Sequence, residues 1–124
     1  MKRIYLDTNF IMIPAQHKVD IFSEIEKIMH EKYQLYIVER TLKELEFIAQ
    51  NGKQKEKLQV KLAKSIIKTQ NIKIDTSDQE TSVDDLLVEL SKKGHIVATQ
   101  DIGLKKRIKE NIITLRQKKY LIFK

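Results

Sequence analysis

Four acidic side chains, far apart in the sequence, stand where predicted strands and helices begin or end. They are Asp7, Glu44, Asp84 and Asp101. Carboxylate oxygens are the ligands that Mg²⁺ and Mn²⁺ prefer, and a few of them can hold one or two ions while positions stay open for a phosphate. A cluster of like charges is costly without cations. If the fold brings these acids together, they predict a divalent-metal site that can hydrolyse phosphodiester bonds.

Each acid also has a structural explanation. Asp7 and Asp101 could cap a turn or a helix, and Glu44 could belong to a capping box. Asp84 and Asp85 could both be acids that the helix dipole favours in a first turn. Because carboxylates can both cap helices and bind metal, the four together carry more weight than any one of them.

Polar neighbours could support the acids. Thr8 and Asn9 follow Asp7 directly and could orient its carboxylate or a metal-bound water, and Thr99 could do the same for Asp101. In contrast, the three histidines are scattered without a zinc-ligand spacing, and the chain has no cysteine. With three glycines in all, it lacks the glycine-rich loops that cradle nucleotides.

Strands alternate with helices along the chain, which predicts an α/β fold with a mainly parallel central sheet and helices on both faces. The predicted strands are 3–6, 34–38, 72–74, 95–99 and 112–115, and the predicted helices are 19–29, 41–51, 53–68, 82–93 and 102–110. Residues 10–15 are expected to form a loop or a short first helical turn, and residues 75–81 a loop. The tail, 116–124, is expected to extend the sheet edge or to lie on the surface.

Strand 3–6 is the natural central strand, and Asp7 follows its carboxyl end. In an open parallel sheet, ligands bind at that edge, where Asp101 also follows its strand. Thr41 with Glu44 predicts a capping box that opens a helix, and Gly52 is expected to end this helix in a left-handed conformation. One crevice could then collect all four acids.

In helix 53–68, the spacing of Leu58, Leu62 and Ile66 predicts an inward apolar face opposite a lysine-rich outer face. Ser82, with Asp85 three residues later, repeats the capping signature and is expected to open helix 82–93.

The composition indicates one domain, 1–124, with an aliphatic core. The chain has no apolar run long enough to span a membrane and no signal peptide, and the absence of cysteine fits a cytoplasmic location. The formal net charge is +7, and seven lysines face one acid between Lys53 and Lys73. Such a charge favours a polyanionic partner such as RNA, although a lysine-rich or thermophilic proteome is an alternative explanation.

Together these motifs make the chain similar to the PIN-domain nucleases over essentially its whole length. The similarity rests on Asp7-Thr8-Asn9 after the first strand, on Glu44 early in a helix, on Val83-Asp84-Asp85-Leu86-Leu87, and on Val97-Ala98-Thr99-Gln100-Asp101. Within that family, residues 7–16, 97–101 and 116–120 resemble small archaeal relatives of the eukaryotic PIN nuclease of small-subunit ribosomal RNA processing.

The resemblance implies a PIN-like domain with Mg²⁺- or Mn²⁺-dependent endoribonuclease activity that leaves 5′-phosphate and 3′-hydroxyl ends. It places the metal-binding and catalytic acids at Asp7, Glu44, Asp84 and Asp101, with Asp85 as a competing choice for the third acid. Many relatives carry a further acid where this chain has Gly103.

The partner implied by the resemblance is RNA, above all a ribosomal RNA precursor. No association with a membrane is expected. Two other functions stay open: a ribonuclease toxin of the VapC type, which usually accompanies an antitoxin, and a non-catalytic RNA-binding ribosome assembly factor. Homodimerisation and contacts with ribosome assembly proteins are also left open.

Overall fold

The computed structural model describes residues 1–78 and 80–124, and Gln79, inside the expected loop 75–81, lies outside the described residues. The strands are β1 (Lys2–Leu6), β2 (Tyr33–Val38), β3 (Lys73–Asp75), β4 (Ile96–Ala98), β5 (Ile112–Arg116) and β6 (Tyr120–Phe123). The helices are α1 (Thr8–Ile11), α2 (Ile13–His17), α3 (Ile21–Ile28), α4 (Glu39–Asn51), α5 (Gln54–Thr69), α6 (Val83–Lys92) and α7 (Ile102–Ile108).

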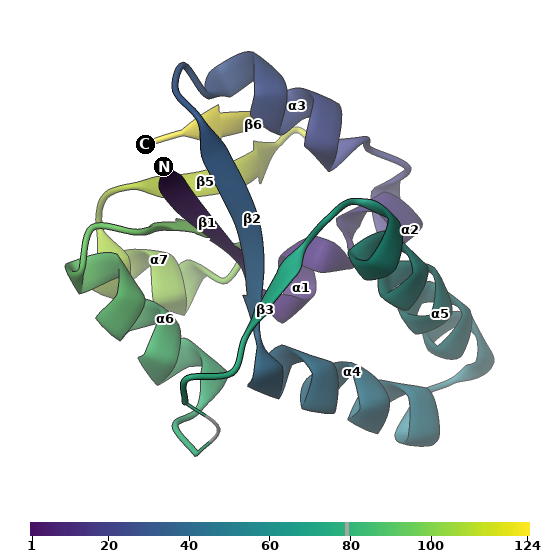
Figure 1. Ribbon diagram of the computed structural model, residues 1–124. Coiled ribbons are helices and arrows are strands. Elements are labelled where there is room, and N and C mark those ends of the chain that lie inside the picture. The colour runs from purple at the N-terminus through teal and green to yellow at the C-terminus, as the bar shows by residue number, and fades with distance from the viewer. Residues whose placement is uncertain (79) are drawn as a thin grey trace.

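The strands form one six-stranded sheet in the order β3-β2-β1-β4-β5-β6 (Figure 1). All neighbouring strands of the sheet pair in parallel, except β5 and β6, which form an antiparallel hairpin. The predicted α/β fold with a mainly parallel sheet is therefore confirmed, and the tail takes the first of its two expected places, as an edge strand.

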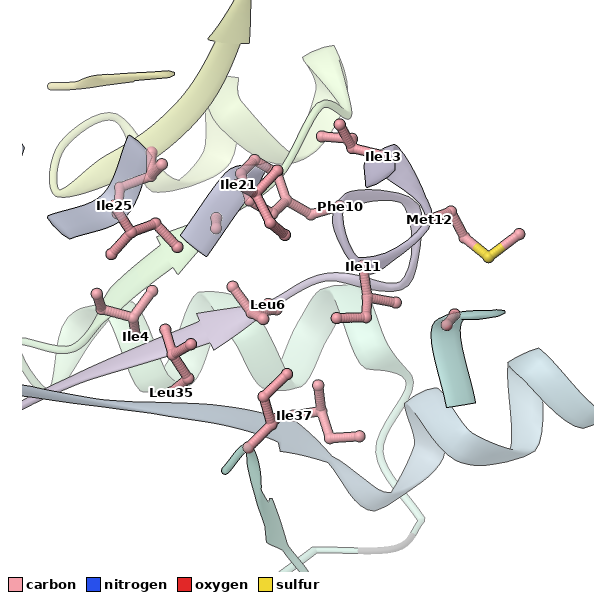
Figure 2. Packing of buried hydrophobic residues seen from close by; sticks show 14 of the residues in the cluster. Ile4, Leu6, Phe10, Ile11, Met12, Ile13, Ile21, Ile25, Leu35 and Ile37 are labelled. Atoms are coloured by element: carbon pink, nitrogen blue, oxygen red, sulfur yellow. The ribbon is translucent and has the colours of Figure 1, made fainter. Parts of the chain in front are cut away.

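The central strand β1 is buried on both faces of the sheet. Ile4 and Leu6 join one core with residues of α1 to α5, and part of this packing is visible in Figure 2. Tyr5 points to the opposite face, where residues of α6 and α7 form a second core. Three consecutive buried residues in β1 are the pattern expected of a strand that is covered on both sides.

The chain leaves β1 in one direction toward β2 and β3 and later returns to β1's other side as β4. The strand order thus reverses between β1 and β4, and such a switch point opens a crevice at the carboxyl ends of the strands. Asp7 and Thr99 extend this edge, because Asp7 N donates to Ala98 O at 2.9 Å and Thr99 N donates to Ile113 O at 3.0 Å.

Three local predictions are wrong. Residues 10–15 lie mostly in two short helices, α1 and α2, rather than in a loop or a single short turn. Helix α4 begins at Glu39 without a side-chain cap, so Thr41 opens no capping box. Gly52 has φ −80° and is not left-handed.

The predicted inward face of α5 is wrong for two of its three residues, since only Ile66 packs against the core. Leu58 and Leu62 are exposed, and the buried residues of α5 are Val60, Ala63 and Ile67. In contrast, the start predicted for α6 is confirmed, because Ser82 Oγ accepts a hydrogen bond from Asp85 N at 3.3 Å. Among the described residues, no helix is long and apolar enough to cross a membrane.

Candidate active site

A cavity of about 390 Å³ lies at the switch point of the sheet. All four predicted acids line it: Asp7, Glu44, Asp84 and Asp101. They come from four places in the chain, namely the end of β1, the second turn of α4, the first turn of α6 and the N-cap of α7. The fold therefore brings together side chains that the sequence separates by up to 94 positions (101 − 7).

Asp7 is the buried member of the group, with 5% of its surface exposed. Its Oδ1 accepts from Thr8 N at 2.8 Å, and its Oδ2 accepts from Thr99 Oγ1 at 2.7 Å. Burial raises the pKa of Asp7 above its ordinary value; these two hydrogen bonds oppose that rise, and the charges of Asp84 and Glu44 add to it. The negative charge on Asp7 is thus costly where it stands, and a bound cation would offset that cost.

Thr99 connects two of the acids. Its hydroxyl donates to Asp7 and accepts from Asp101 N at 3.1 Å, so one side chain fixes both the first and the last acid of the sequence. Asp101 in turn caps α7 by accepting from Leu104 N at 3.0 Å. The sequence predicted a supporting contact from Thr99 to Asp101 only, and its hydrogen bond to Asp7 adds a second contact.

Thr8 and Asn9 support the site in different ways. The Thr8 hydroxyl donates to Glu44, which ties α1 to α4 across the cavity. Among the described hydrogen bonds, Asn9 is joined not to Asp7 but to Gln100, because its Oδ1 accepts from Gln100 N at 3.2 Å and holds the loop before Asp101.

Asp84 and Asp85 separate clearly in space. Asp84 lines the cavity, whereas Asp85 forms an ion pair with Arg107 of α7, with 2.8 Å between Oδ1 and Nη2. The Arg107 guanidinium lowers the pKa of Asp85, with help from its hydrogen bond with Ser82. Asp84 is therefore the acid that the fold directs to the other three.

Sequence reasoning missed two polar contributors. Glu56 of α5 also lines the cavity, and it was the one acid within a lysine-rich stretch, a signal that could have drawn attention to it. Gln100 accepts from Thr114 Oγ1 at 2.8 Å and from Leu115 N at 2.6 Å, which anchors the loop of Asp101 to β5. No sequence pattern marks the role of Gln100, because it depends on the neighbouring strand.

The donor set fits a hard divalent cation. All four acids offer oxygen ligands, and each carboxylate oxygen that accepts a hydrogen bond still has a second lone pair. Among the described residues, no three His, Asp or Glu side chains already stand in the close arrangement of a metal cage. Mg²⁺ keeps several of its waters and is bound through one or two carboxylates, so an open group of acids is compatible with it.

Residues 4–118 match the family described as PIN like domain. The chain belongs to this family. The match runs from within β1 to the β5–β6 turn and includes all four predicted acids.

Two curated relatives are each 34% identical to this chain. Ribonuclease VapC4 of Methanocaldococcus jannaschii aligns with 97% of this chain and 95% of its own length. The rRNA-processing protein FCF1 of Saccharomyces cerevisiae aligns with 87% of this chain but only 54% of its own length, so this chain spans about half of that relative.

Solved structures agree with the fold. The PIN domain endonuclease Utp24 superposes with a TM-score of 0.75 and 25% identity, over 96% of this chain and 88% of that chain. A domain of a functionally unknown protein from Methanocaldococcus jannaschii superposes with a TM-score of 0.60 at 19% identity, over 94% of this chain and 92% of that chain, which supports the fold alone.

Proposed function

We propose that this chain, as one nuclease domain over residues 1–124, is a divalent-metal-dependent endoribonuclease that acts on structured RNA in ribosomal RNA processing. The observation that carries the proposal is the convergence of Asp7, Glu44, Asp84 and Asp101 on one cavity at the switch point of the sheet. The similarity to proteins named ribonuclease, rRNA-processing protein and PIN domain endonuclease supports it.

In this proposal, the four acids hold Mg²⁺ or Mn²⁺, which would stabilise charge on the phosphodiester and lower the pKa of a water. The chain's own residues set the geometry. Thr99 keeps Asp7 and Asp101 in place, and Thr8 orients Glu44. Hydrolysis would leave 5′-phosphate and 3′-hydroxyl ends. The net charge of +7 favours the approach of RNA.

The test compares wild type with Asp101→Asn on structured ribosomal RNA fragments, with Mn²⁺, with Mg²⁺ and with chelator. Asparagine caps helices about as well as aspartate, so the variant should keep α7 and stay folded. We expect metal-dependent cleavage by wild type and a loss of about 100-fold or more in the variant, as for removal of one electrostatic group from a site. End-labelling then identifies the 5′-phosphate.

Equal cleavage by both proteins would point to contamination and count against the proposal. Binding without cleavage by wild type, in every metal condition, would instead favour the non-catalytic assembly factor.

A second candidate function is a ribonuclease toxin of the VapC type. The observation that favours it is the 34% identity to Ribonuclease VapC4 over nearly the full length of both chains. The two functions predict the same cleavage chemistry but different partners. Purification from the native host distinguishes them, because a toxin should co-purify with a small antitoxin, and a processing nuclease with ribosomal precursor RNA or assembly proteins.

A further inference from the structure

A second cavity, of about 400 Å³, lies between the connection of α2 to α3 and the turn that joins β5 to β6. In Figure 1, α3 lies over the part of the sheet formed by β5 and β6. Five basic side chains line this cavity, which we call the basic groove: His17, Lys18, Lys27, Lys118 and Lys119.

The acids of the basic groove already have partners. Asp20 caps α3, accepting from Phe22 N at 3.1 Å and from Ser23 N at 3.2 Å. Glu24 forms an ion pair with Lys27 at 3.0 Å and also accepts from Leu121 N at 3.3 Å. Among the described residues, no ion pair involves Lys18, Lys118 or Lys119. The groove therefore presents uncompensated positive charge.

The backbone is strained at two lysines of the groove, Lys18 and Lys118. Lys18, with φ 55°, ends α2 in the left-handed conformation, where glycine is usual. Gln117 and Lys118, with φ 53° and 56°, are the two central residues of the β5–β6 turn, and Lys119 N donates to Arg116 O at 3.0 Å. Turns of this kind strongly prefer Asn-Gly. Glycine would remove the strain but also the charged side chains.

Neighbouring residues at the end of α2 line the candidate active site and the basic groove. Gln16 lines the cavity of the four acids, and the next residue, His17, lines the groove. A chain of phosphates that bound at both places would pass over the end of α2.

We propose that the basic groove binds the phosphodiester backbone of the same RNA strand that enters the acidic cavity, a few nucleotides from the scissile bond. This inference rests on the proposed function, which supplies the RNA in the neighbouring cavity. RNA is favoured over an acidic protein because the groove offers cations without a pocket of exposed apolar residues to anchor a side chain.

The test measures binding of a short fluorescein-labelled single-stranded RNA by fluorescence anisotropy. EDTA is present, so that binding is measured without metal-dependent cleavage of the RNA. Lys118→Gly should weaken binding about 3- to 10-fold and reduce the slope of log K against log salt by about 0.7, as expected for one lost phosphate contact. Because glycine suits the positive φ of this position, the melting temperature should stay the same or rise. Lys118→Arg keeps the charge and should bind like wild type.

Lys109→Gly is the matched control. Lys109 also has positive φ, 74°, and carries the same charge, but it lies at the end of α7, just before β5 and thus at the opposite edge of the sheet. Equal weakening by Lys109→Gly and Lys118→Gly, or none by either, would overturn the groove proposal. Since binding is measured without metal, a failure of the groove is distinguishable from a failure of the nuclease, which shows in the cleavage test instead.

Discussion

Asp84 and Asp85 are neighbours in the sequence but have opposite electrostatic surroundings. Asp84 lies near Asp7, whose pKa its charge helps to raise, whereas Asp85 is paired with Arg107 on the surface. A site that gathers acids without an organised countercharge is less stable than it could be, a common feature of functional sites. The two residues therefore provide a comparison of a proposed metal ligand with a structural acid.

We predict that Asp84→Asn reduces RNA cleavage about 100-fold or more, while Asp85→Asn leaves it nearly unchanged. Stability should respond in the opposite order. Asp84→Asn loses a favourable interaction with the helix dipole but also the repulsion with Asp7, so the free energy of unfolding should change by less than about 0.5 kcal/mol. Asp85→Asn loses the dipole interaction and an exposed ion pair without relieving any repulsion, so it should be the less stable variant of the two.

Cleavage assays and urea unfolding of both variants check this prediction. If Asp85→Asn were the inactive variant, Asp85 would be the third acid and the assignment of Asp84 would be wrong.

Residue identity in the site was predictable from the sequence, whereas contacts were not. Asp7 and Asp101 could be placed because they directly follow buried strands, and the carboxyl ends of parallel strands share an edge. Gln100 could not, since its role depends on which backbone of β5 lies within reach of its amide. Thr99 was assigned to Asp101 from its position, but its hydroxyl also reaches Asp7, 92 positions away.

At the scale of elements, the sequence predicted the strands β1 to β5 in their order along the chain, but it left β6 as one of two alternatives for the tail and did not predict which face α5 buries. Leu58, Leu62 and Ile66 form one stripe at helical spacing, and Val60, Ala63 and Ile67 form another. Periodicity alone favours neither. The structure buries the stripe that includes Ala63, a small side chain that permits close approach of the helix to the core.

Gly52 illustrates a second limit of local patterns. Glycine after a helix usually signals a left-handed C-cap. Here it is needed for space instead, because a Cβ at this position would lie 2.6 Å from Ile48 O, in the preceding helix. The helix end was predicted correctly, but for the wrong physical reason, since the close approach is to the last turn of α4 itself, where Ile48 O accepts a hydrogen bond from Gly52 N at 2.8 Å.

The edge strand β3 is short and is held to the sheet by more than its backbone. The buried Tyr5 of β1 donates its hydroxyl to Asp75 Oδ2 at 2.7 Å, across the intervening β2, and its ring stacks on Tyr36. Arg3 donates to the same hydroxyl at 3.2 Å. Burial, together with the hydrogen bond to Asp75, raises the pKa of Tyr5 to about 12.

We predict that Tyr5→Phe removes an ionisation near pH 12 from the ultraviolet titration of the four tyrosines. The unfolded chain loses the Tyr5 proton near pH 10 and the folded chain retains it, so this stabilising contribution is complete below pH 10 and is lost as the pH rises to about 12. At neutral pH the variant should lose about 1 kcal/mol, the usual value of one hydrogen bond.

Tyr33→Phe is the control and should keep the ionisation near pH 12. Burial also raises the pKa of Tyr33, but its hydroxyl has no part in the contact with β3. Persistence of that ionisation in Tyr5→Phe would contradict the assignment.

At the scale of the whole molecule, the acidic cavity joins the two layers that cover the sheet. Glu44 belongs to a helix of the larger core, while Asp84 and Asp101 belong to helices of the core on the opposite face. Asp7 stands between them at the end of the central strand. A cation held by these acids would therefore connect both layers and relieve their repulsion at the same time.

We predict that Mn²⁺ or Mg²⁺ stabilises the whole fold. At a free metal concentration of about ten times Kd, linkage gives about 1.4 kcal/mol, which corresponds to a rise in Tm of about 5 °C for a domain of this size. Calorimetry with metal and with chelator measures this rise. In Asp7→Asn the rise should be abolished, because the variant lacks the acid that stands between the two layers, whereas Asp85→Asn should respond like wild type. An equal rise in all three proteins would mean that the metal binds elsewhere on the chain, and the acids of the cavity would then need another explanation.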